Sequence, residues 1–411
     1  METSRSQVLT VPGGDPATAR MKLPERLFLR FLRDLRGGCL SVEMPGGGTW
    51  RVGDPAAPPV SMRIVDRAFF RRVFLGGSVG FGEAYVDGLW ETDALPEVLR
   101  LLARNQREVG RLARGFSAVS AFLNRSYHRG RRNTLRKSRE NIREHYDLSN
   151  DFYASFLDAT LTYSSARFES GEETLETAQI NKIERMLDLA GGRPGDSILE
   201  IGTGWGALAE RAALRGCSVK TITLSEAQYR YTRDRLASRE LDGRVEVLLQ
   251  DYRDLSGEYD AVVSCEMVEA VGQEYLEMFF DALRRSVRVG GRVVLQAITI
   301  PDGRYRRYCK SCDWIQKYIF PGGHLPSPGV LRRLSRQAGL RIERMEGFGK
   351  DYARTLRCWA DRFNAAERRV ERLGFDARFR RKWNYYLAYC EAGFATELID
   401  VKHMVMERTQ A

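Results

Sequence analysis

The 411-residue chain lacks the features that mark membrane-spanning, secreted and metal-binding proteins. No segment approaches the roughly 20 consecutive apolar residues of a spanning helix. The polar stretch from Met1 to Met21 has no apolar core of a signal peptide. The seven cysteines show no disulfide framework, and the lone C-x-x-C of Cys309 and Cys312 has no second pair at zinc spacing. We therefore expect a cytoplasmic protein without a metal site, whose contact with any membrane is peripheral.

Acidic residues are too few to balance the basic ones. The 65 Lys and Arg residues against 54 Asp and Glu residues give a formal charge of +11. This balance predicts an anionic partner, namely nucleic acid, anionic lipid or an acidic small molecule, and simple Arg-rich solubility is the alternative. The charge alone would suit a nucleic-acid-binding protein, but the chain carries no RNA-recognition motif, so we expect no nucleic-acid partner.

The length and the 43% of apolar residues predict more than one folded domain. Two short β-type runs flank Pro45–Gly48, which is a hairpin pattern. The segment 125–143 carries eight basic residues against one acidic residue, and it is either a mobile connector or a patch for phosphate groups. The expected organisation is a disordered terminus over residues 1–20, a small α+β domain over 21–124, a basic linker over 125–143 and a catalytic domain over 144–411.

Apolar runs alternate with helical patterns in the second half of the chain. This alternation predicts a parallel, doubly wound α/β sheet, followed by an aromatic-rich interruption over 301–340, a helical tail over 357–398 and a last strand over 400–407. The strands of the parallel sheet are expected at Ser197–Gly202, Val219–Leu224, Val245–Gln250, Asp260–Cys265 and Arg292–Ile300.

The first of these strands runs into a glycine-rich loop. Glu200 is followed by Gly202, Gly204 and Gly206, and a helical pattern begins at Ala207. A strand, a glycine loop and a helix in this order form the nucleotide crevice of open α/β sheets. The spacing differs from the dinucleotide G-x-G-x-x-G, and E-x-G-x-G-x-G is typical of S-adenosylmethionine (SAM) methyltransferases. The loop therefore predicts a SAM site; an ordinary tight turn is the alternative.

Longer motifs make the prediction more specific. They are His145–Asn150, Leu199–Gly206, Thr223–Gln228, Tyr318–Gly322 and, in the N-terminal part, Phe74–Trp90. With them the chain resembles the cyclopropane-fatty-acyl-phospholipid synthase and mycolic acid cyclopropane synthase family. The resemblance implies a Rossmann-like class I SAM methyltransferase domain, and residues 21–124 resemble the lipid-associated N-terminal domain of the phospholipid-acting members.

The resemblance also implies which residues contact SAM. Thr223 and Leu224 follow the second strand, where a Rossmann-like domain reads the ribose, and Gln228 is a suitable donor and acceptor there. Tyr252 follows the third strand, where adenine could stack, although an ordinary surface aromatic is the alternative. The full implied set is Tyr163, Ser164, Gly202, Gly204, Thr223, Leu224, Gln228 and Tyr252.

The implied reaction transfers a methyl group to a cis double bond of an unsaturated phospholipid acyl chain. The resulting carbocation is deprotonated by a base, and a cyclopropane ring is the expected product. A methylene- or methyl-branched chain is the alternative product. Aromatic faces suit a cation, which makes Tyr163, Phe168, Tyr318 and Phe320 candidates to line its path, with core packing as the alternative role.

In the family the base is a bound bicarbonate. Glu269, Ile298 and Tyr352 match the residues that hold it, whereas Ser165 stands in place of a Cys and Gln296 in place of a His. Both substitutes can still donate to an anion, but the titratable imidazole is lost. The substitutions therefore leave two interpretations open, a changed fate of the carbocation or neutral drift.

The expected partners are an unsaturated phospholipid and an anionic membrane surface, at the inner face of the membrane. Whether the protein forms a homodimer is left open by the sequence. Two rivals remain. An RNA methyltransferase is suggested by the basic charge, and the lack of an RNA-recognition motif argues against it. A non-enzymatic lipid-binding protein is motivated by Ser165 and Gln296, and the retention of every implied SAM contact argues against that.

Overall fold

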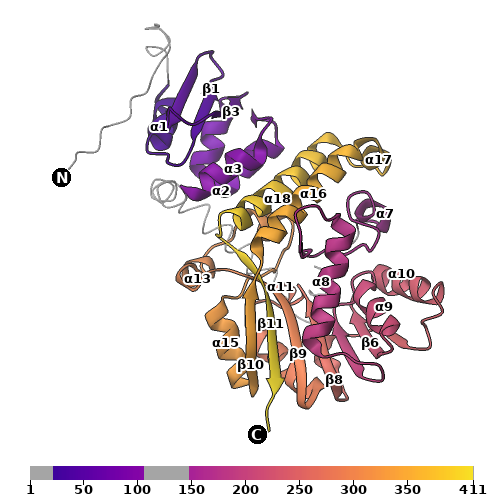
Figure 1. Cartoon of the computed structure of the whole chain (residues 1–411). Helices are drawn as coiled ribbons and strands as arrows, with labels where there is room; N and C mark the ends of the chain where they lie inside the picture. Colours follow the sequence, from indigo (N-terminus) through magenta and orange to yellow (C-terminus); the bar gives the residue numbers. More distant parts are fainter. Residues whose placement is uncertain (1–21, 106–147, 411) are drawn as a thin grey trace. The chain divides into compact units, whose positions relative to one another are not determined.

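The computed structural model describes residues 22–105 and 148–410. The predicted disordered terminus, the basic linker and the start of the His145 motif lie outside these residues. The described chain forms two compact units (Figure 1). The first comprises residues 22–105, 311–314 and 375–396, and the second comprises the remainder.

The first unit is an α+β structure around a four-stranded sheet with the order β2-β1-β3-β4. The predicted hairpin is present, because β1 and β2 pair antiparallel across Pro45–Gly48, and β3 pairs parallel to β1 on its other side. The elements are α1 (Leu23–Leu32), β1 (Cys39–Glu43), β2 (Thr49–Gly53), β3 (Pro59–Ile64), α2 (Ala68–Val86), β4 (Trp90–Glu91), α3 (Leu95–Arg104) and α18 (Ala377–Ala395).

Helix α18 belongs to the first unit although the sequence pattern placed it with the catalytic domain. It packs on α2 and α3. The reason is visible at Gly82 of α2, where a Cβ atom would lie 2.6 Å from the ring of Tyr385 and 2.7 Å from the ring of Trp314. The glycine-rich segment 76–82 is therefore part of a helix, kinked at Gly77, and serves close packing.

The second unit contains a seven-stranded sheet with the order β10-β11-β9-β8-β5-β6-β7. Five strands from β9 to β7 run parallel, as predicted, and β11 lies antiparallel between β9 and β10 (Figure 1). The strands are β5 (Ser197–Ile201), β6 (Ser218–Thr223), β7 (Val245–Leu249), β8 (Tyr259–Cys265), β9 (Val287–Thr299), β10 (Leu340–Gly347) and β11 (Asp400–Arg408). Edge strand β10 was not predicted, because its charged sequence LRIERMEG leaves most side chains at least partly exposed.

Helices cover both faces of this sheet, and each face has its own apolar core. One core includes α8 and α9, and the other includes α12 and α15. The helices are α7 (Asn150–Tyr153), α8 (Leu175–Ala190), α9 (Ala207–Leu214), α10 (Glu226–Ala237), α11 (Val268–Val271), α12 (Leu276–Ser286), α13 (Asp302–Tyr308), α14 (Trp314–Tyr318), α15 (Pro328–Gln337), α16 (Gly349–Ala365) and α17 (Glu367–Arg372), with 3₁₀ turns at Tyr252–Asp254 and Gln273–Tyr275.

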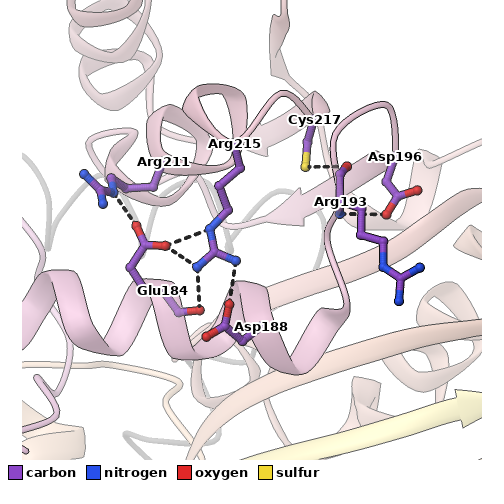
Figure 2. Close-up of polar contacts among 7 residues, drawn as sticks. All are labelled: Glu184, Asp188, Arg193, Asp196, Arg211, Arg215 and Cys217. Carbon is purple, nitrogen blue, oxygen red and sulfur yellow. Dashed lines mark hydrogen bonds and ion pairs between the residues drawn. The ribbon is translucent and has the colours of Figure 1, made fainter.

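An ion-pair cluster joins α8 to α9, the helix that follows the glycine loop (Figure 2). Glu184 accepts hydrogen bonds from Arg211 and Arg215, and Arg215 also donates to Asp188 at 2.7 Å. These side chains are partly exposed, so each pair contributes on the order of 1 kcal/mol or less. The cluster fixes the position of α9 and lies outside the predicted site.

Candidate active site

The candidate site lies where the strand order reverses. The chain passes from β5 to β6 and β7 on one side, and then returns to place β8 on the other side of β5. In open α/β sheets, ligands bind beyond the carboxyl ends of the strands at such a point. The glycine loop follows β5, and Glu266 follows β8, so both lie at this switch point.

The glycine loop presents bare backbone. Gly202, Gly204 and Gly206 all have positive φ angles, of 102°, 55° and 84°. No protein atom lies within 4 Å of the point where Gly204 would carry a Cβ atom, so a ligand can approach the backbone there. At Gly206 a Cβ atom would lie 2.6 Å from the methyl group of Thr232, so this glycine serves packing. The open backbone at Gly204 therefore fits a nucleoside-type cofactor, whereas a Cβ atom at Gly202 would lie 3.3 Å from the Met267 side chain.

The predicted ribose-reading residues lie together at the end of β6. The Thr223 hydroxyl and the Gln228 side-chain oxygen are 2.9 Å apart, and both residues are 7% exposed. The Ser225 side chain caps α10 and so fixes the position of Gln228. The amide nitrogen of Gln228 has no partner among the described residues, so it remains available as a donor to a hydroxyl group. Leu224 is half-buried beside them.

Tyr252 is buried, at 9% exposure, so it is not an ordinary surface aromatic. Its ring stands edge-on to Phe279 with 5.3 Å between ring centroids. Burial raises the pKa of Tyr252 to about 12. The phenol is therefore neutral at physiological pH, and the Arg253 guanidinium lies over one ring face at 5.4 Å from the centroid.

Tyr163 and Ser164 have different surroundings. The Tyr163 ring packs against Tyr153 and Trp359 at centroid distances of 5.2 and 5.3 Å. The Ser164 hydroxyl accepts a hydrogen bond of 2.7 Å from the buried ammonium of Lys182. Thus Tyr163 belongs to an aromatic cluster, whereas Ser164 is held by a buried cation that the sequence analysis did not predict.

Three of the predicted base-side residues converge on Glu266, which the sequence analysis also missed. Glu266 Oε1 accepts from the backbone N–H of Ser165 at 2.9 Å and from Gln296 Nε2 at 2.7 Å. Glu266 Oε2 accepts from the Tyr352 hydroxyl at 2.7 Å. Ser165 contributes its backbone rather than its hydroxyl, which donates to the carbonyl of Ala166.

Glu269 and Ile298 form a separate contact. Glu269 Oε1 accepts from the backbone N–H of Ile298, and its Oε2 is buried without a hydrogen-bond partner among the described residues. Burial, and then the nearby charge of Glu266, raises the pKa of Glu269 to about 8. At neutral pH the Glu269 carboxyl is therefore mainly protonated.

His403 fixes the orientation of Gln296. Its Nε2 lies 2.9 Å from Gln296 Oε1, and burial lowers the pKa of His403 to about 3. The imidazole is therefore neutral, and its Nε2–H donates to the Gln296 oxygen. That leaves the amide N–H groups of Gln296 directed at Glu266 and at the carbonyl of Ser165, 3.2 Å away.

One signal in the sequence could have identified Glu266, because it directly follows the predicted strand 260–265. A charged residue at the carboxyl end of a central strand is a candidate ligand-facing group. His403 lies in β11 and Lys182 in α8, both far from Glu266 in the sequence. No local sequence pattern therefore connects them with the site. Among the aromatic candidates, the Phe168 face is covered by the Arg354 guanidinium at 3.9 Å, so that face does not line a path for a carbocation.

Within residues 22–105 and 148–410, no helix has the length and apolarity that crossing a bilayer requires. In the same residues, no three His, Cys, Asp or Glu side chains are grouped in a way that could hold a metal ion.

Comparisons with known proteins agree with this architecture. The sequence profile of the family described as mycolic acid cyclopropane synthetase matches residues 133–404. Tuberculostearic acid methyltransferase UfaA1 of Mycobacterium tuberculosis is 42% identical, over 98% of this chain and 94% of its own length. The cyclopropane-fatty-acyl-phospholipid synthase of Escherichia coli K12 is 34% identical, over 85% of this chain and 88% of its own.

Among solved structures, mycolic acid cyclopropane synthase CmaA1 in complex with SAH and CTAB is 32% identical. It covers 66% of this chain and 98% of its own length, with a TM-score of 0.62. The match to the family spans well over half of the chain. The protein therefore belongs to the mycolic acid cyclopropane synthetase family and is a SAM-dependent methyltransferase with a class I methyltransferase fold.

Proposed function

We propose that the protein adds a one-carbon unit from SAM to a cis double bond of an unsaturated acyl chain carried by a phospholipid. The observation that carries this proposal is the pairing of two features at one edge of the sheet. A glycine loop that admits a cofactor follows β5, and a hydrogen-bonded carboxylate follows β8. A methyl donor and a proton acceptor are what methylation of an alkene requires.

The chain's own residues would bind and orient the reactants. SAM, when bound, supplies an electrophilic methyl group, which an unactivated alkene can attack. Gly204 would admit the cofactor to the backbone, Gln228 would donate to a ribose hydroxyl, and Tyr252 would stack on the adenine. The aromatic cluster around Tyr163 would stabilise positive charge on the acyl chain through ring faces.

A phospholipid substrate is supported by how far the relatives extend along the chain. The mycolic acid enzyme CmaA1 aligns over 98% of its own length but over only 66% of this chain. The phospholipid synthase of E. coli aligns with 85% and UfaA1 with 98%. The first unit therefore has a counterpart in UfaA1 and at least a partial one in the phospholipid synthase, and we assign it to contact with the lipid surface.

Membrane contact by the first unit is supported by its surface. Leu23, Leu27 and Leu75 are 62%, 38% and 56% exposed, and exposed arginines such as Arg26 and Arg71 accompany them. Apolar side chains next to basic ones are suited to the interface of an anionic bilayer. The basic linker, which lies outside the described residues, would add to the same attraction.

A cyclopropane ring is the product expected from the family, and a methylene- or methyl-branched chain is the second candidate. The second candidate is favoured by Gln296 and Glu266, which give the base side its own amide–carboxylate pair. It is also favoured by UfaA1, which is named as a methyltransferase rather than as a cyclopropane synthase.

Mass spectrometry of lipids from cells that express the protein tests the proposal. Unsaturated phospholipid acyl chains should gain one CH₂ unit, and NMR of the product then separates a ring from an exomethylene group. Unchanged acyl chains in cells that contain folded protein and SAM would contradict the proposed function.

A further inference from the structure

We propose that the side chain of Glu266 is the base that deprotonates the methylated acyl chain, so that the protein carries its own carboxylate where its family uses a bound bicarbonate. This inference rests on the proposed function and adds a catalytic residue to it. If Glu266 replaces the anion, wild type should not bind bicarbonate at this site, and this can be tested without turnover.

The hydrogen bonds of Glu266 leave it able to accept one proton. An ionised carboxylate offers about four lone-pair positions. Ser165 and Gln296 occupy both positions on Oε1, and Tyr352 occupies one on Oε2. No other donor among residues 22–105 and 148–410 reaches Oε2, so one position there remains for a proton. The three donors also fix the carboxylate in place, as a base acting on a short-lived cation requires.

The backbone at Glu266 indicates that this placement is specific. Its φ angle is 50°, in the left-handed region that glycine adopts readily and that other residues adopt at a cost. Its N–H donates to the carbonyl of Gln296 at 2.8 Å, so backbone and side chain both contact the same residue. Non-glycine residues persist in such conformations where the surroundings hold them, and these positions cluster at functional sites.

The same donors cannot serve a second anion. The Ser165 N–H, the Gln296 amide and the Tyr352 hydroxyl come from residues that the family resemblance assigns to bicarbonate. In this chain all three donate to Glu266. A bicarbonate would have to displace the carboxylate and then lie beside its negative charge, with a second carboxyl, Glu269, close by.

The surroundings of Glu266 act on its pKa in opposite directions. Burial raises its pKa, while the hydrogen bonds from Ser165, Tyr352 and Gln296 and the ammonium of Lys182 favour the ionised form. Lys182 is itself buried and is held by the Ser164 hydroxyl at 2.7 Å and by Cys265 Sγ at 3.4 Å. A raised pKa makes the Glu266 carboxylate a stronger proton acceptor than an exposed one.

The step balances without a further reactant. The π electrons of the alkene form the new C–C bond as the C–S bond of the sulfonium breaks and its electron pair stays on sulfur. The neighbouring alkene carbon becomes cationic. A proton then moves to Glu266 Oε2. Its C–H electron pair closes the ring when the proton leaves the new methyl group, or forms a C=C bond within the chain when the proton leaves a neighbouring chain carbon. An exomethylene group forms when a 1,2-hydride shift first moves the cation to the methylated carbon and the methyl group then loses the proton. Glu266 finally returns the proton to water.

The test uses the full-length protein with SAM and unsaturated phospholipid vesicles in buffers freed of carbon dioxide. Wild type should keep its rate without bicarbonate. Glu266→Gly, which removes the carboxylate and relaxes the backbone, should lose about 10²–10⁴-fold in rate and regain activity when bicarbonate is added. Glu266→Gln fills the same space and should stay inactive with or without bicarbonate. Glu240→Gly is the matched control, because Glu240 is exposed and also has a left-handed φ, of 56°, and it should behave as wild type.

A second readout is independent of activity. NMR with ¹³C-labelled bicarbonate should detect binding to Glu266→Gly and none to wild type. Three results would each overturn the proposal: wild type binds bicarbonate at this site, the rate of wild type falls when bicarbonate is removed, or Glu266→Gly keeps the full rate in the absence of bicarbonate. If wild type transfers no carbon to lipid at all, the proposed function fails, and the NMR result alone decides whether Glu266 replaces the anion.

Discussion

The side of the candidate site that we propose for the cofactor consists of backbone and neutral side chains, whereas the proposed base side contains buried ionisable groups. Gly204 and Gln228 represent the first side, and Glu266 and Lys182 represent the second. A cofactor site built from backbone atoms can be recognised from a short sequence motif. A base site made of side chains from several elements depends on tertiary packing, so a single residue outside the motif can change its chemistry.

Among the effects that test this comparison, the largest is expected at the glycine loop. Gly204→Val places a branched side chain where no protein atom now lies and at a φ angle of 55°, which valine strongly disfavours. SAM binding should weaken by more than about a hundredfold, or about 2.8 kcal/mol, in calorimetry. Gly195→Val is the control, because Gly195 also has a positive φ and open space but is exposed and away from the site. Equal SAM affinity of folded Gly204→Val and wild type would remove the loop from the cofactor site.

A smaller effect is expected at Tyr352, on the base side. Tyr352→Phe removes the hydroxyl that donates to Glu266 Oε2 and keeps the ring. A hydrogen bond to a charged group contributes about 1.5–3 kcal/mol, so kcat should fall by about 10- to 100-fold. SAM affinity should stay that of wild type, as measured by calorimetry. A loss of SAM affinity equal to the loss in kcat would show that the two sides are not separate.

The buried carboxyl of Glu269 should make stability depend on pH. Its pKa of about 8 in the folded state lies above the unfolded value of 4.5. Between these values the folded state holds a proton that the unfolded state has released, so stability falls as pH rises, by at most about 1.4 kcal/mol per pH unit. Glu269→Gln should lose less stability than wild type between pH 5 and 8 in chemical denaturation. Parallel curves for the two proteins would show that Glu269 is ionised in the folded state.

The smallest effect per residue is expected for membrane binding. Sedimentation with anionic vesicles should fall as salt is added, and replacing the basic residues of segment 125–143 with glutamine should weaken binding by about 1 kcal/mol for each charge removed. Vesicles of zwitterionic lipid are the comparison. Binding to both vesicle types that is insensitive to salt would leave the segment as a plain connector.

The sequence predicted those parts of the molecule in which local pattern and tertiary structure agree. The strands of the parallel sheet and the glycine loop are examples, because apolar runs and glycines there serve the sheet directly. Edge strand β10 was missed because it is charged, and α18 was misplaced because its partner α2 is about 300 residues away in the chain. Glu266 was missed because its role depends on Gln296 and Tyr352, which only the fold brings together.

The central claim, one-carbon transfer from SAM to an acyl double bond followed by removal of one proton, is tested most directly with methyl-deuterated SAM. Purified protein, labelled SAM and vesicles of a cis-unsaturated phospholipid should give a product whose acyl chain has gained one labelled carbon. If the base acts on the transferred methyl group, this carbon keeps two of its three deuterium atoms, whereas all three are kept if the proton leaves a chain carbon. Label that appears on the lipid head group, or no label in the lipid despite SAM binding, would contradict the account.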